Sequence, residues 1–113
     1  MQMTKQPESR RAKHVREHLL RDLIDPKKAA LYLNAAAEDS DSLFLLALRD
    51  VAEARRIPAV AQQAGMHRQM LYRMLSETGN PTHASLRKIM KAVGLRLVVE
   101  PAGTSRQRKG RTR

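Results

Sequence analysis

The chain has 113 residues, which is room for one domain with a modest core, and 42 % of them are hydrophobic. One Phe, two Tyr and no Trp favour packed helices with an aliphatic core, and the absence of Cys excludes disulfides and cysteine-based zinc sites. The net charge of +11, from 22 Lys and Arg against 11 Asp and Glu, suits a polyanionic partner.

No segment of the sequence signals export or membrane insertion. The apolar stretches are far shorter than the roughly 20 residues that span a bilayer, and the N-terminus lacks the apolar core of a signal peptide. Together with the lack of cysteines, this pattern predicts a protein of the reducing cytoplasm.

Charge divides the chain into segments. Residues 1–22 carry six basic and three acidic side chains, which predicts a basic extension that is partly helical or disordered. Residues 23–54 have a net charge of −3, whereas residues 55–100 have a net charge of +6. Residues 103–113 carry five positive charges, no negative charge and no apolar side chain, as a disordered basic tail does. The predicted folded domain is therefore 23–102, with halves that face different surroundings.

Two helices are expected in the acidic half. The first begins at Asp25, whose side chain can cap backbone N–H groups, and Pro26 fits its first turn. Its inward stripe consists of Ala29, Leu33, Ala36 and Ala37. The second begins near Asp41 or Ser42 and continues to about Arg56. Its inward face consists of Phe44, Leu48 and Val51.

Three helices are expected in the basic half. Two short ones, over residues 58–64 and 67–75, are separated by Gly65, which tolerates the positive φ of a tight turn. A third begins at the cap Thr82 and stops at Gly94. Its apolar positions have helical spacing and are Leu86, Ile89, Met90 and Val93.

Residues 95–100 change to the alternation of a strand. Leu95, Leu97 and Val99 share one face, and the intervening side chains share the other. The chain offers no second strand, and unpaired backbone groups are costly when buried. The strand is therefore expected to pair with the same strand of a second copy in a homodimer, or with a partner protein.

Residues 57–75 have the spacing of two helices that cross steeply. Gly65 occupies the turn, and the small Ala61 lies where helix must approach helix. The inward apolar positions are Val60, Ala64, Met66, Leu71 and Met74. This pattern predicts a helix-turn-helix, and the whole chain is expected to be all-α, a bundle of about five helices plus the single C-terminal strand.

The chain resembles the lambda-repressor/Cro class of helix-turn-helix domains over residues 41–94. The stretches LFLLALRDVAEARR, LYRMLSETGNPT and LRKIMKAVGLRLVVEP more narrowly resemble addiction-module antidote proteins, the DNA-binding antitoxins of HigA type that pair with small RelE/ParE-like toxins. With AALYLNAAAEDSDS included, the resemblance covers residues 23–101.

The resemblance implies that residues 67–75 form the recognition helix, which enters the DNA major groove. Its outward side chains are Arg68, Gln69, Tyr72 and Arg73. Arg can hold guanine O6 and N7, Gln can hold adenine N6 and N7, and Tyr can reach phosphates or base edges. His67 and Thr82 complete the set of expected DNA contacts, and a general attraction for phosphates is expected from Arg55, Arg56, Arg87, Lys88 and Lys91.

Two departures from the relatives' pattern affect this interface. Pro58 and Ala59 stand where relatives place a Ser or Thr cap and a Gln, so one contact to a phosphate is lost. His67 replaces the usual Ser cap of the recognition helix; His caps poorly, although a protonated His can approach a phosphate.

An enzyme has little support in this sequence. His14, Glu17 and His18 spell the H-x-x-E-H pattern of inverted zinc peptidases, but a basic extension supplies neither a third ligand nor a substrate cleft. There is no glycine-rich phosphate loop, no G-x-S-x-G elbow and no thiol nucleophile. We therefore expect no catalytic residue, no cofactor and no metal.

The leading hypothesis is a dimeric antitoxin that represses its own operon and neutralises a small basic toxin. One alternative is a stand-alone phage or metabolic regulator, which a neighbouring reading frame for a small basic protein would argue against. Another is a protein-interaction adaptor that has kept the fold but lost DNA binding, which Pro58 and Ala59 favour mildly.

Overall fold

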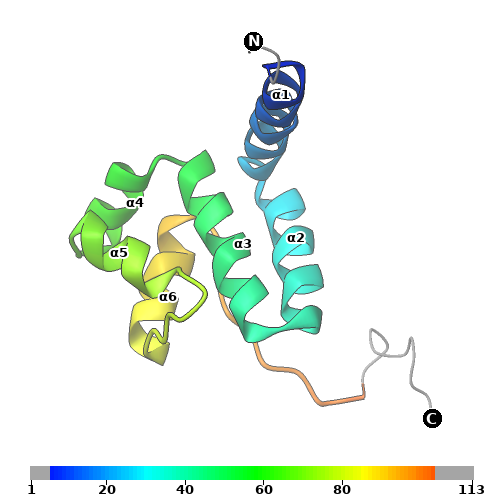
Figure 1. Cartoon of the computed structure of the whole chain (residues 1–113). Helices are drawn as coiled ribbons and strands as arrows, with labels where there is room; N and C mark the ends of the chain where they lie inside the picture. The colour runs from blue at the N-terminus through cyan, green and yellow to red at the C-terminus, as the bar shows by residue number, and fades with distance from the viewer. Residues whose placement is uncertain (1–5, 104–113) are drawn as a thin grey trace.

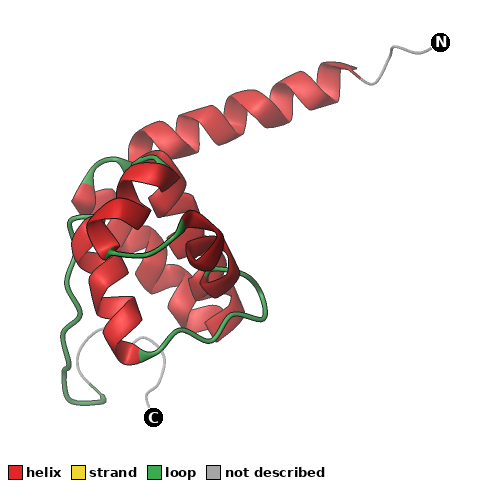
Figure 2. Ribbon diagram, turned by 90° about the vertical axis from the view of Figure 1, so that its left-hand side faces the viewer, coloured by secondary structure: helices red, strands yellow, loops and turns green. Residues whose placement is uncertain are grey.

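Six helices follow one another in the computed structural model, which describes residues 6–103 (Figure 1 and Figure 2). They are α1 (Gln6–Leu23), α2 (Pro26–Asp39), α3 (Asp41–Ala54), α4 (Ile57–Ala64), α5 (Arg68–Met74) and α6 (His83–Ala92). Within this range no helix has both the length and the apolar character required to cross a bilayer. The expectation of a helical bundle is confirmed, with six helices instead of about five.

Side-chain caps explain where three of these helices begin. Asp25 Oδ1 accepts a hydrogen bond from Lys27 N–H at 2.9 Å at the start of α2, as the sequence predicts. Thr82 Oγ1 accepts one from Ser85 N–H at 3.0 Å at the start of α6, also as predicted. The cap of α3 is Ser40, which lies one residue before the expected start.

Helix α3 lies at the centre of the molecule. Helices α2 and α3 run antiparallel, side by side, and α4, α5 and α6 gather on the other side of α3 (Figure 1). The C-terminal part of α1 packs against α2 and α3, whereas its N-terminal turns project beyond the bundle (Figure 2). The expected N-terminal extension is thus the longest helix of the described chain; residues 1–5 and most of the predicted basic tail, 104–113, lie outside the described residues.

One apolar core joins both sides of α3. It contains no polar or charged residue among those that the structure describes. Its largest fully buried side chains are Leu23, Leu48, Leu71, Leu75, Ile89, Val51, Val60 and Val93. The predicted inward stripes are largely confirmed, except that Ala37 on α2 is exposed. Because helices on both sides share this core, the position of each one depends on the others.

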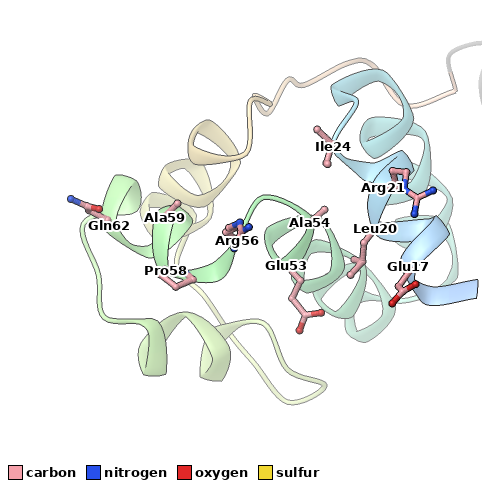
Figure 3. A pocket seen from close by; sticks show the side chains of 10 residues that line it. All are labelled: Glu17, Leu20, Arg21, Ile24, Glu53, Ala54, Arg56, Pro58, Ala59 and Gln62. Carbon is pink, nitrogen blue, oxygen red and sulfur yellow. The ribbon is translucent and has the colours of Figure 1, made fainter. Parts of the chain in front are cut away.

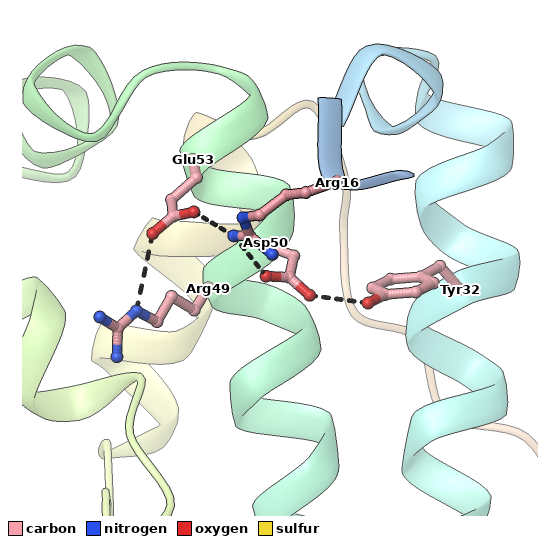
Figure 4. A network of polar contacts seen from close by, with 5 residues as sticks. All are labelled: Arg16, Tyr32, Arg49, Asp50 and Glu53. Atoms are coloured by element: carbon pink, nitrogen blue, oxygen red, sulfur yellow. Dashed lines mark hydrogen bonds and ion pairs between the residues drawn. The ribbon is translucent and has the colours of Figure 1, made fainter. Parts of the chain in front are cut away.

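Charged side chains attach α1 to the centre of the bundle (Figure 4). Arg16 Nη2 on α1 donates to Asp50 Oδ1 at 3.0 Å and also to Glu53 Oε1, both on α3. Tyr32 on α2 donates its hydroxyl to Asp50 Oδ2 at 2.7 Å. Hydrogen bonds to Glu53 and Asp50 raise the pKa of Arg16, and burial, followed by the hydrogen bond to Asp50, raises the pKa of Tyr32 to about 12. The network therefore favours a charged Arg16 and a neutral Tyr32.

The strand predicted over residues 95–100 is not seen in the single chain. These residues lie in no helix or strand, and the rest of the described chain supplies no strand to pair with them. The expected shared face is also divided, because Leu95 packs against the core while Leu97 and Val99 are 38 % and 98 % exposed. Alternation in a sequence indicates extended backbone, but a strand also requires a hydrogen-bonding neighbour.

Candidate nucleic-acid interface

The turn between α4 and α5 depends on Gly65. This residue has φ 72° and ψ 37°, and its N–H donates to the carbonyl of Gln62 at 3.1 Å. The N–H of Met66 donates to the carbonyl of Ala61 at 3.0 Å, so both bonds close the end of α4. A Cβ added at Gly65 would meet no atom within 4 Å, so the backbone conformation, not lack of space, requires glycine.

The inner side of α5 is fixed by apolar contacts. Leu71 and the C-cap Leu75 are both fully buried, and Met66 and Met74 pack against the same core. The inward residues of α4 are buried too: Val60, Ala61 and Ala64. These positions confirm the inward pattern predicted for residues 57–75, and they leave the opposite side of α5 facing outward.

That outward side carries the predicted recognition residues. Arg68, Gln69 and Arg73 are exposed, and no described residue forms an ion pair with either arginine. Tyr72 lies on the same helix and is 37 % exposed. His67 is exposed at the N-cap of α5 and makes no capping hydrogen bond with its side chain, as its residue type predicts.

Arg49 of α3 extends this surface, and the sequence reasoning missed it. Its guanidinium lies over the ring of Tyr72, with 4.9 Å between Cζ and the ring centroid. Glu53, one turn along α3, lies 3.8 Å from Arg49 Nε. The spacing of Arg49 and Glu53 predicts their ion pair, but no sequence signal indicates that Arg49 faces α5.

Two lysines of α6 lie beside the turn. Lys88 and Lys91 line a hollow of about 530 Å³ together with Gln63 and Gly65. Both lysines are exposed and form no ion pair with any described residue. Thr82 is exposed at the other end of α6, where its oxygen is already occupied as the helix cap. The structure therefore brings cations of α6 to the α4–α5 turn.

Arg55 and Arg56 differ from each other. Arg55 is half-buried, and its Nη2 donates to the carbonyl of Ile24 at 3.1 Å, so it links α3 to the end of α1. The expectation that Arg55 attracts phosphates is therefore not supported. Arg56 is exposed and has φ 77°, and it forms no side-chain cap for α4.

A groove of about 880 Å³ separates α1 from α4 (Figure 3). Pro58 and Ala59 line it from α4, and Leu20 and Ile24 line it from the α1 side. The two residues that depart from the relatives' pattern thus give the start of α4 an apolar surface. Sequence reasoning missed the groove because it exists only where α1 packs.

The H-x-x-E-H residues form no metal centre in the described structure. His14, Glu17 and His18 are all exposed on α1. Within residues 6–103, no three acidic or metal-binding side chains gather in a way that could hold an ion.

Comparison with known proteins places this arrangement in a family. The family model described as "Probable addiction module antidote protein" matches residues 16–101, from the second half of α1 to the end of the extended segment. A protein of Haemophilus influenzae, described as "Uncharacterized protein", is 44 % identical over 87 residues, which cover 76 % of this chain and 86 % of that relative. No solved structure matches the chain significantly.

Proposed function

Because this chain belongs to the family of addiction module antidote proteins, we propose that it is a DNA-binding antitoxin that represses its own operon. The observation that carries the proposal is the outward side of α5, where Arg68, Gln69 and Arg73 are exposed on a helix that buried leucines fix in place. An antidote acts by binding its partners, so no residue is assigned a catalytic role.

Contacts to DNA divide into base reading and positioning. Arg68 and Gln69, in the first turn of α5, have the donor and acceptor geometry to read guanine and adenine in the major groove. Tyr72 and Arg73 reach base edges or phosphates one turn later. The phosphate contacts that orient the protein come from Lys88 and Lys91, with His67, Thr82, Arg56 and Arg87 as further candidates.

The proposal includes a homodimer. Two copies present two recognition helices to successive major grooves about 34 Å apart, which suits a pseudo-palindromic operator. Leu97 and Val99 expose apolar side chains beyond α6, where a second copy or a partner can cover them. The DNA-binding unit of this proposal is residues 23–102, with 1–22 and 103–113 as basic arms.

The second partner is a small basic toxin of the RelE/ParE kind, met in the cytoplasm. The turn between α2 and α3 exposes Glu38, Asp39 and Asp41, none of which forms an ion pair with another described residue. Residues 23–54 also carry a net charge of −3, opposite in sign to the rest of the domain. This acidic side is where a basic protein is attracted without competing for the surface of α5.

Fluorescence anisotropy tests the DNA part of the proposal. The labelled probe is a duplex with the DNA upstream of the protein's own reading frame, and a duplex of equal length and scrambled sequence is the comparison. Arg68→Ala is expected to cost about 1 to 3 kcal/mol on the upstream duplex and much less on the scrambled one. Arg11→Ala is the matched control: Arg11 is exposed on α1 away from α5, so any loss of its phosphate attraction is expected to be equal on the two duplexes. Equal losses on both duplexes for Arg68→Ala contradict base reading.

One observation favours a second candidate, a protein-interaction adaptor. Pro58 and Ala59 present apolar groups to the groove at the positions where the family resemblance implies a polar cap and a Gln. An adaptor of this kind binds neither duplex even at low ionic strength, where the attraction between cations and phosphates is strongest. The anisotropy titration at low salt therefore separates the two candidates.

A further inference from the structure

A line of contacts connects α1 to the recognition helix α5. Arg16 of α1 donates to Glu53 Oε1, Glu53 Oε2 lies 3.8 Å from Arg49 Nε, and Arg49 lies over the ring of Tyr72. Figure 4 shows the first three of these residues, with Glu53 between the two guanidinium groups. Every step is a contact between different helices or between successive turns of α3.

Arg49 is shared between two partners that compete for it. Its guanidinium stacks on Tyr72 at 4.9 Å while its ion pair with Glu53 is long, at 3.8 Å. Glu53 also accepts a hydrogen bond from Arg16, through its other carboxylate oxygen. Because Glu53 divides its carboxylate between Arg16 and Arg49, loss of Arg16 would leave Glu53 free to close on Arg49 and draw it from the ring.

The position of Tyr72 matters because its ring lies at the surface. The side chain is 37 % exposed, and Arg68 and Arg73 flank it on α5. A cation held over one face of an exposed aromatic ring attracts the ring and limits the orientations it samples. A side chain ordered before binding loses less conformational entropy when it meets a ligand.

We propose that Arg16 and Arg49 are positioning residues for DNA recognition. The docking of α1 holds Glu53 beside Arg16, so that Glu53 does not draw Arg49 from the ring, and Arg49 orders Tyr72 on the DNA-facing side of α5. The role in recognition rests on the proposed function, whereas the contact between Arg49 and Tyr72 and its dependence on Arg16 can be tested without DNA.

Nuclear magnetic resonance tests the positioning step directly. The Nε–Hε group of Arg49 experiences the ring current of Tyr72, and Tyr72→Leu identifies that contribution because it removes the ring. Arg16→Gln is expected to abolish the ring-current shift in a protein that is still folded. Arg21→Ala is the matched control, since Arg21 is an exposed arginine of α1 for which the structure shows no side-chain partner. An unchanged Arg49 signal in Arg16→Gln overturns the proposal.

A suppressor variant separates positioning from general loss of stability. In the double variant Arg16→Gln, Glu53→Gln, the neutral amide has no charge with which to draw Arg49 away, so the ring-current shift is expected to return. Arg16→Lys keeps a cation beside Glu53 and is expected to retain the shift. It is the variant to measure if Arg16→Gln does not fold. A folded double variant without the shift, or an Arg16→Lys protein without it, contradicts the mechanism.

Anisotropy on the upstream duplex then connects positioning to recognition. Arg16→Gln is expected to weaken binding about two- to fivefold, as loss of an exposed cation–π contact would. In a Tyr72→Leu background, Arg16→Gln should cause no further loss, because its effect on binding passes through that ring. Losses that multiply overturn the link to recognition. If the unaltered protein binds neither duplex, the proposed function fails, while the resonance measurements still decide whether α1 positions Arg49.

Discussion

Among the described residues, charged side chains are paired with one another on one side of α3 and unpaired on the other. On the side of α1 and α2, charged groups bind one another, as Arg16, Asp50 and Glu53 do in one network (Figure 4). On the side of α4, α5 and α6, apolar contacts hold the helices, and no cation carried by these three helices has an ion pair with a described residue. Residues 1–22 carry +3 and residues 23–54 carry −3, whereas residues 55–100 carry +6, so this second side has the charge to attract a polyanion.

The contrast separates charges that pair within the fold from charges that are left to attract a ligand. Cations that are paired inside the molecule are partly neutralised, whereas unpaired cations keep their attraction for phosphates. Arg49 belongs to both the paired and the outward-facing cations, because it contacts Glu53 on one side and Tyr72 on the other. Substitutions on each side of α3 test whether its two sides differ in this way.

The largest expected effect is the loss of an apolar anchor on the α5 side. Leu71→Ala removes a fully buried side chain and leaves a cavity, so the free energy of unfolding should fall by about 2 to 5 kcal/mol. Met70→Ala, one residue earlier and 41 % exposed, should change it by less than about 0.5 kcal/mol. Urea denaturation of both variants measures the difference. Similar losses would mean that α5 is not held by its inner side.

The next effect concerns the network on the α1 side and appears at alkaline pH. The pKa of Tyr32 is about 12 in the folded chain and about 10 in an unfolded chain, so the folded state favours the neutral phenol. Its contribution to stability is fully present below about pH 10 and is lost as pH rises through 12. The Tm of thermal unfolding should therefore fall less steeply with rising pH for Tyr32→Phe than for the unaltered chain. Tyr72→Phe, the control, should keep the steep dependence, and identical slopes in all three proteins would argue against the network.

A smaller effect is expected from the helix caps on the α4–α6 side, where one substitution should lower the free energy of unfolding by about 1 kcal/mol and another should raise it by about as much. Thr82→Ala removes the hydrogen bond to Ser85 N–H and should lower the free energy of unfolding. His67→Ser should raise it, because His67 already has extended cap geometry, φ −76° and ψ 148°, without a capping bond. Urea denaturation reports both changes. A destabilising His67→Ser would indicate that His67 has a structural role other than capping.

The smallest effect is expected from an exposed ion pair near the α1–α2 turn. Lys28 Nζ lies 3.5 Å from Asp22 Oδ1, and the two side chains are 58 % and 56 % exposed. Water screens such a pair, so Lys28→Ala should change the free energy of unfolding by less than about 0.5 kcal/mol. A larger loss would show that even the exposed charges on this side stabilise the fold.

The parts of the fold that depend on neighbouring residues were predictable. The caps Asp25 and Thr82 and the glycine turn at Gly65 each depend on backbone within a few residues, and all three are confirmed. The inward pattern of α4 and α5 was equally readable, because helical spacing alone selects their buried side. The outward residues of α5 followed from the same pattern, since they are what the buried side leaves exposed.

Contacts between helices that are distant in the sequence were not predictable. Arg49 meets Tyr72, and Arg16 meets Asp50 and Glu53, across distances in the chain that no local pattern encodes. The strand expected over residues 95–100 is not seen for the same reason, since a strand requires a hydrogen-bonding neighbour and the rest of the described chain supplies none.

Side-chain spacing and local hydrogen bonding were enough to predict the five helices after α1, the caps Asp25 and Thr82, the glycine turn and the outward side of α5. Only the tertiary structure decided where α1 docks, that Arg55 links α3 to Ile24, and that Arg49 stands over Tyr72. The physical reason is that a shared apolar core sets how helices are placed against one another, and charged side chains then pair with whatever that placement brings within reach.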